Sequence, residues 1–219
     1  MKTDITVVLD RSGSMEPLAA DVIGGLNAFV KTQQQVEGEA HFTLVQFDDE
    51  YEVVHFRVPV ADVPRVTRRT YVPRGCTALL DAIGRTINDI SSRIEAMDTA
   101  TRPDQVIVAV QTDGQENASK EYTRQQVLTM IQAREQAAVA DAARPTWEFV
   151  FLAANQDAIQ EGGSMGFAPS RAVDFDADGG GVQAVFSMVA DKIASKRRSS
   201  TATMDFSESD RAQAKRKKH

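Results

Sequence analysis

The stretch VVLDRSGSM, residues 7–15, is an apolar run with an abrupt polar end. The run ITVVL at 5–9 is mostly β-branched, which predicts a central strand buried on both faces. Asp10 follows it directly, and Ser12 and Ser14 come next at spacings of two. In α/β sheets, ligands bind at the edge where the parallel strands end. The stretch therefore predicts a site of carboxylate and hydroxyl oxygens at that edge.

Strand-like and helix-like segments alternate along the rest of the chain. Segments 41–47 and 52–58 are separated by four residues, too few for a crossover, which predicts an antiparallel hairpin at the sheet edge. Further strands are predicted at 105–113, 147–155 and 172–175, and helices at 16–35, 77–94, 123–138 and 182–196. This order predicts an α/β fold: a Rossmann-like, doubly wound, mostly parallel sheet with one antiparallel edge strand and helices on both faces.

Two other segments place oxygen atoms at the same predicted edge. Asp113 ends the strand at 105–113, and Thr77 lies where a loop enters a helix. Carboxylates and hydroxyls, with no thiolate or imidazole nearby, favour Mg²⁺ or Mn²⁺ over zinc. Only two carboxylates would surround such an ion. We therefore expect it to accept a further carboxylate from another molecule.

These residues resemble the metal-ion-dependent adhesion site (MIDAS) of the von Willebrand factor A (VWA) domain family. The shared pattern is Asp-x-Ser-x-Ser after the first strand, a threonine before a central helix and the aspartate of TDG. All five positions match: Asp10, Ser12, Ser14, Thr77 and Asp113. The order of elements is similar over roughly residues 3–195. The sequence most resembles the small bacterial members of the family that act inside the cell.

The resemblance implies specific roles for these residues. The serines would contact Mg²⁺ (or Mn²⁺) directly, and the threonine and the two aspartates directly or through water. The ion would then bind an Asp or Glu side chain of a partner protein. The chain is thus expected to be a non-enzymatic, metal-dependent protein-interaction module. The family suggests settings such as an accessory of an AAA+ ATPase, a stress-response system or phage defence.

Composition predicts the domain organisation and the compartment. The formal net charge is −6, yet residues 196–219 contain eight basic and three acidic residues. This predicts a VWA domain over 1–196 and a basic, disordered tail over 197–219. Cys76 is the single cysteine, which fits a reducing compartment. We expect a cytoplasmic protein with no membrane partner, because no signal peptide and no apolar run of membrane-spanning length are present.

Three other interpretations remain open at this point. Four of the predicted site residues could simply cap the helices that follow them: Asp10, Ser12, Thr77 and Asp113. The chain could be a metal-dependent, phosphatase-like enzyme, although those enzymes need a second aspartate where Ser12 stands. It could associate with nucleic acid through the basic run KRKK at 215–218, although an acidic body and 6% aromatic residues argue against this.

Overall fold

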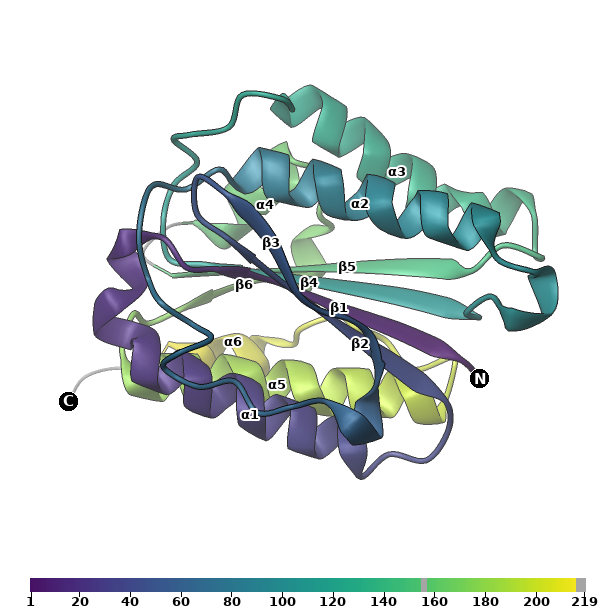
Figure 1. Cartoon of the computed structure of the whole chain (residues 1–219), viewed down its shortest axis with the longest axis horizontal. Helices are drawn as coiled ribbons and strands as arrows, with labels where there is room; N and C mark the ends of the chain where they lie inside the picture. The colour runs from purple at the N-terminus through teal and green to yellow at the C-terminus, as the bar shows by residue number, and fades with distance from the viewer. Residues whose placement is uncertain (155–156, 216–219) are drawn as a thin grey trace.

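The computed structural model describes residues 1–154 and 157–215. Within them, one sheet has the strand order β3-β2-β1-β4-β5-β6, and β3 alone is antiparallel to its neighbour (Figure 1). The strands are β1 (Thr3–Asp10), β2 (Ala40–Phe47), β3 (Tyr51–Pro59), β4 (Gln105–Thr112), β5 (Thr146–Ala154) and β6 (Ala172–Phe175). The predicted fold class is therefore confirmed.

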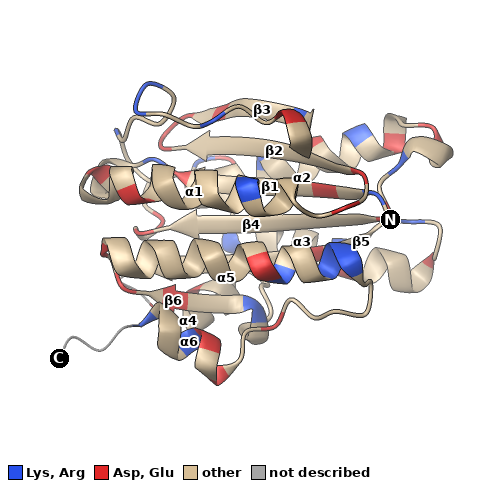
Figure 2. Cartoon of the chain, turned by 90° about the horizontal axis from the view of Figure 1, so that it is seen from below, with Lys and Arg blue, Asp and Glu red and all other residues tan. Residues whose placement is uncertain are grey.

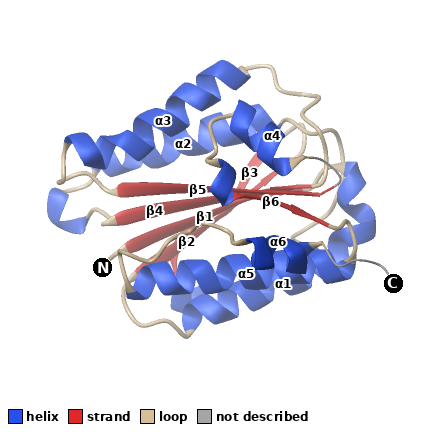
Figure 3. Cartoon of the chain, turned by 180° about the vertical axis from the view of Figure 1, so that it is seen from behind, coloured by secondary structure: helices blue, strands red, loops and turns tan. Residues whose placement is uncertain are grey.

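Helices cover both faces of the sheet, with α2, α3 and α4 on one face and α1, α5 and α6 on the other (Figure 3). The α-helices are α1 (Ala19–Gln34), α2 (Leu79–Ala96), α3 (Arg124–Ala140), α4 (Ala158–Ser164), α5 (Gly179–Arg198) and α6 (Glu208–Ala214). The 3₁₀ helices are η1 (Gly13–Leu18), η2 (Val60–Asp62), η3 (Thr99–Thr101) and η4 (Pro169–Arg171). Among the described residues, no helix is long and apolar enough to cross a membrane.

Strand β1 lies between β2 and β4 and is buried along its whole length. Ile5, Val7 and Leu9 pack toward α1 and α5, whereas Val8 packs toward α2 on the opposite face. This alternation is expected of a strand covered on both faces. The parallel register pairs Leu9 with Gln111 of β4, which brings the residues that follow the two strands side by side.

The predicted hairpin is confirmed as β2 and β3. Strand β2 is an inner strand and nearly all of it is buried, so only β3 forms the edge. On β3 the side chains of Val53 and Phe56 are 41% and 60% exposed. The opposite edge, β6, has only four residues and is covered by the C-terminal part of the chain.

That C-terminal part corrects the prediction of a disordered tail over 197–219. Helix α5 continues to Arg198, and the chain then returns along the domain to α6. Met204 and Ala214 are fully buried and Phe206 is nearly so, all within the core cluster on the α1 and α5 face. The sequence prediction failed because these few apolar residues follow no helical or strand period. Residues 216–219, with most of the KRKK run, lie outside the described residues.

The predicted domain boundary also falls inside packed structure. Lys196 forms an ion pair with Glu148 at 2.9 Å. Arg197 is buried and donates hydrogen bonds to the carbonyl oxygens of Gln33 at 2.6 Å and Val36 at 3.0 Å. The Gln33 carbonyl belongs to the last turn of α1, where a cation is favourable because these carbonyls carry the negative end of the helix dipole.

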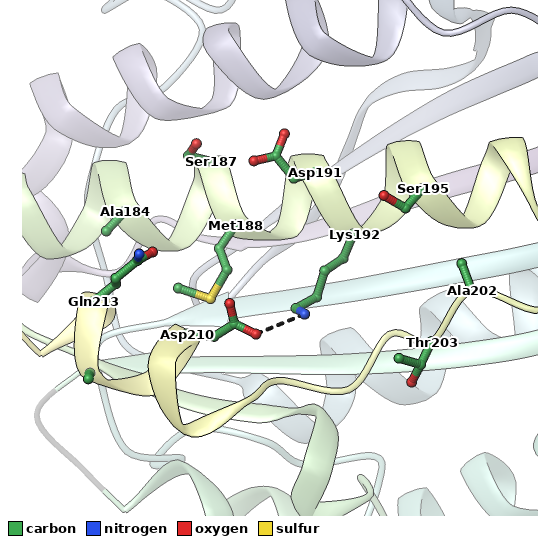
Figure 4. Close-up of a pocket in the computed structure, with 11 residues that line it drawn as sticks. Ala184, Ser187, Met188, Asp191, Lys192, Ser195, Ala202, Thr203, Asp210 and Gln213 are labelled. Carbon is green, nitrogen blue, oxygen red and sulfur yellow. Dashed lines mark ion pairs between the residues drawn. The ribbon is translucent and has the colours of Figure 1, made fainter.

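A groove of about 960 Å³ runs between α5 and the C-terminal segment (Figure 4). Lys192 points across it to Asp210, and their charged atoms lie 2.9 Å apart. The same ammonium group lies 5.2 Å from the centre of the Phe206 ring. These contacts fasten the returning segment to α5.

Candidate metal centre

Three loops at the carboxyl edge of the sheet bring the five predicted residues together. The Ser14 hydroxyl donates a hydrogen bond to Asp113 Oδ1 at 2.7 Å, and the Ser12 and Ser14 hydroxyl oxygens lie 3.1 Å apart. A Cβ added to Gly114 would lie 3.2 Å from Thr77 Oγ1 and 3.5 Å from Ser14 Oγ. Both hydroxyls therefore face the backbone just after Asp113.

Asp10 lies at the base of this group and is fully buried. Its Oδ1 accepts the Ser12 backbone N–H at 2.6 Å, and its Oδ2 accepts the Thr112 hydroxyl at 2.5 Å. Burial raises the pKa of Asp10 to about 6, although these hydrogen bonds lower it in part. Burial also raises the pKa of Asp113, whereas the hydrogen bond from Ser14 lowers it in part. Two carboxylates so poorly solvated would be stabilised in their charged form by a cation.

The spacing of the oxygen atoms fits a small octahedral cation. Mg²⁺ binds oxygen at about 2.0–2.1 Å in octahedral geometry, so adjacent ligand oxygens lie about 2.9 Å apart. The oxygen pairs Ser12–Ser14 and Ser14–Asp113 are separated by 3.1 and 2.7 Å. Hard oxygen donors at this spacing suit Mg²⁺ or Mn²⁺.

Helix capping does not explain these residues. Ser12 precedes η1 but makes no side-chain capping hydrogen bond. The residue at the cap position of α2 is Ala78, so Thr77 is not the cap. Helix α3 is capped by Thr123, ten residues after Asp113. Ser12, Thr77 and Asp113 thus do not cap these helices, and the side chains of Ser12, Ser14 and Asp113 contact one another instead.

Several residues that hold the site in place were missed by the sequence analysis. The Tyr71 hydroxyl donates to the carbonyl oxygen of Asp10 at 2.7 Å. Two hydrogen bonds join Asn117 to Thr77. The Thr77 backbone N–H donates to Asn117 Oδ1 at 2.9 Å, and the Asn117 backbone N–H donates to the Thr77 carbonyl oxygen at 3.1 Å. Thr112 could have been noticed because it directly precedes Asp113. Nothing in the sequence around Tyr71 or Asn117 pointed to their roles.

An ionic cluster around the buried carboxylate of Asp48 fixes the loop of Thr77 to the loop of Ser12. Asp48 is fully buried and accepts hydrogen bonds from the guanidinium Nε atoms of Arg11 at 3.0 Å and Arg74 at 2.8 Å. Its backbone carbonyl also accepts Ala78 N at 2.8 Å. Gly75 has φ +67°, and a Cβ there would collide with Asp49. Glycine is therefore required where this loop crosses the hairpin turn.

Solved structures similar to this chain include several VWA domains. Proximal thread matrix protein 1 from the mussel byssus, with a zinc-occupied MIDAS motif, matches at a TM-score of 0.59 and 15% identity, covering 87% of this chain and 48% of that one. The ArnB paralog VWA2 from Sulfolobus acidocaldarius matches at a TM-score of 0.55 and 10% identity, covering 88% of this chain and 45% of that one. A von Willebrand factor type A protein from Catenulispora acidiphila matches at a TM-score of 0.54 and 14% identity, covering 87% of this chain and 42% of that one.

No family model and no curated protein matches the sequence. The chain spans less than half the length of the three solved proteins just named. At these identities the similarity establishes the architecture and not the activity. The sheet order, the antiparallel edge strand and the two helical layers are those of the VWA fold.

Proposed function

We propose that this chain binds Mg²⁺ or Mn²⁺ at the candidate metal centre and uses the ion to bind an acidic side chain of a partner protein. The residues that would hold the ion are Asp10, Ser12, Ser14, Thr77 and Asp113. The observation that carries the proposal is their convergence: the oxygen atoms of Ser12, Ser14 and Asp113, from two separate loops, lie 2.7–3.1 Å apart. Thr77 Oγ1, from a third loop, faces the same backbone as Ser14 Oγ, at Gly114. A bound ion would supply positive charge toward an incoming carboxylate.

The surrounding residues determine how strongly such an ion is held. The backbone N–H of Ser12 and the Thr112 hydroxyl orient the Asp10 carboxylate, and the Ser14 hydroxyl orients Asp113. Because only two of these five residues, Asp10 and Asp113, carry carboxylates, we expect weak binding of the free ion and tighter binding with the partner carboxylate. Linkage requires each ligand to strengthen the other's binding by the same factor.

The comparisons support the proposal through one neighbour, since the mussel protein carries zinc in its MIDAS motif on the same fold. We further propose that the protein is a bacterial, cytoplasmic, non-enzymatic module. The residue two after Asp10 is Ser12, whose hydroxyl contacts Ser14, so the general acid of a phosphatase is missing there. An AAA+ ATPase accessory, a stress-response role or a phage-defence role would each suit such a module.

The test is Mn²⁺ binding by calorimetry and electron paramagnetic resonance. Thr77→Val keeps the side-chain shape and should weaken Mn²⁺ binding at least about tenfold, about 1.4 kcal/mol. Asp10→Asn should reduce binding below detection. Ser187→Ala, at an exposed serine of α5, is the matched control and should leave binding unchanged. Wild-type protein that binds no Mn²⁺, or a Thr77→Val protein that binds it normally, would overturn the proposal.

A further inference from the structure

The loop between η2 and α2 is strongly basic in an otherwise acidic protein. Residues 63–76 read VPRVTRRTYVPRGC, with four arginines and no acidic residue, whereas the whole chain carries −6. Arg65, Arg68 and Arg69 are exposed, and none of their side chains forms an ion pair among the described residues. Three unpaired guanidinium groups on one loop form a surface suited to an anionic partner.

Buried anchors on both sides hold this loop in a defined shape. Val66 is buried, and its backbone N–H and carbonyl each bond the Asn27 side chain of α1 at 2.9 Å. Tyr71 is buried as well. Between them, the backbone N–H of Thr70 closes a turn onto the carbonyl oxygen of Thr67 at 3.0 Å. A turn fixed in this way loses little conformational entropy when its side chains bind a partner.

Arg65, Arg68 and Arg69 lie on or next to this turn, which we call the arginine turn. The same anchors place the arginine turn beside the candidate metal centre. Tyr71 donates its hydroxyl to the carbonyl oxygen of Asp10, and Gln46 donates to Thr70 O at 2.9 Å. Gln46 pairs in register with Leu9, the residue before Asp10. In Figure 1 the loop runs across the end of the sheet where the parallel strands finish. In Figure 2 a blue stretch projects at the upper left, at the end toward which the β4 arrow points.

We propose that Arg65, Arg68 and Arg69 form a second contact for an acidic segment of the partner protein, one carboxylate of which binds the metal. The inference rests on the proposed function of the metal centre. A partner segment rich in Asp and Glu would be repelled by the net charge of this chain. The arginine turn supplies local positive charge at the same end of the sheet as the candidate metal centre. The metal then selects one carboxylate, and the arginines select further acidic residues around it.

Nucleic acid is the competing anionic ligand, and the structure favours it less. The chain is acidic as a whole and poor in aromatic residues, at 6%. Single-stranded nucleic acid is normally bound on aromatic stacking platforms within a basic groove. The arginine turn is flanked by Val66, which is aliphatic and buried, and by Tyr71, whose ring is buried and offers no stacking surface.

The test uses a synthetic octaglutamate peptide with Mn²⁺ and the full chain. Arg68→Glu/Arg69→Glu should weaken peptide binding about tenfold or more, chiefly through the association rate, and should reduce its salt dependence. Arg144→Glu/Arg198→Glu makes the same change of charge at exposed residues, Arg144 just before the start of β5 and Arg198 at the end of α5, and should alter binding less than about twofold. Neither double variant should change the affinity for Mn²⁺ alone, because none of these residues reaches the ion.

The outcomes separate this inference from the proposed function. If wild-type protein binds neither Mn²⁺ nor the peptide, the metal centre itself fails. If it binds both and Arg68→Glu/Arg69→Glu binds the peptide normally, the arginine contact alone is wrong. Binding of a uridine octanucleotide that persists in EDTA and is lost in Arg68→Glu/Arg69→Glu would overturn the acidic partner in favour of nucleic acid.

Discussion

The loops of the candidate metal centre and the C-terminal segment 199–215 are held in place by different physical means. The loops depend on polar contacts that begin at the ends of strands, such as the bonds of Asp10 and of Asp48. The C-terminal segment depends on a few apolar side chains, chiefly Met204 and Phe206, inserted into a core built by distant elements. Polar chemistry at strand ends leaves a local motif in the sequence. Isolated apolar anchors leave none.

The sharpest way to test this contrast is to remove the C-terminal segment. Truncation after Arg198 should expose the core around Met204 and uncover β6, at a cost of about 5 kcal/mol in the free energy of unfolding. For a domain of this size that corresponds to a fall in Tm of about 10–20 °C. A change of less than about 2 °C, measured by calorimetry, would show that the segment does not pack as described.

A single substitution should separate stability from metal binding. Met204→Ala should cost about 3 kcal/mol because a fully buried side chain is replaced by a cavity. Tm should fall by about 6–12 °C, while the affinity for Mn²⁺ stays unchanged. Val139→Ala, at a side chain that is 89% exposed, is the matched control and should change neither quantity. A weakened Mn²⁺ affinity in Met204→Ala would show that the two regions are coupled.

The two sheet edges provide a finer test. Strand β3 is open, whereas β6 is covered by contacts such as the hydrogen bond from Asp176 N to Ala214 O at 3.1 Å. Backbone amides at 52–58 should exchange with solvent about 100-fold faster than those at 5–9 in the central strand. Amides of β6 should exchange more slowly than those of β3 despite the shorter strand. Equal, deep protection of β3 and β1 would contradict the edge placement.

The same contrast explains which sequence predictions succeeded. The run before Asp10 identified a central strand because a strand buried on both faces must be apolar throughout. The short link after Phe47 identified the hairpin because four residues cannot cross a sheet. Tyr71 and Asn117 were missed because their hydrogen bonds join residues 61 and 40 positions apart. Such pairings depend on the three-dimensional path of the loops.

The amino-acid sequence by itself determined the α/β architecture, the antiparallel edge and the candidate site residues, because each follows from a local period or from side chains at a strand end. Only the tertiary structure showed that the C-terminal segment packs on the domain and where the arginine turn lies. Met204 is buried because α5 and β6 form a surface that it covers. The loop that carries Arg68 and Arg69 is held at the candidate metal centre because buried Tyr71 bonds the backbone of Asp10. Burial of an isolated side chain depends on partners brought together by folding, and no neighbouring residues in the sequence encode them.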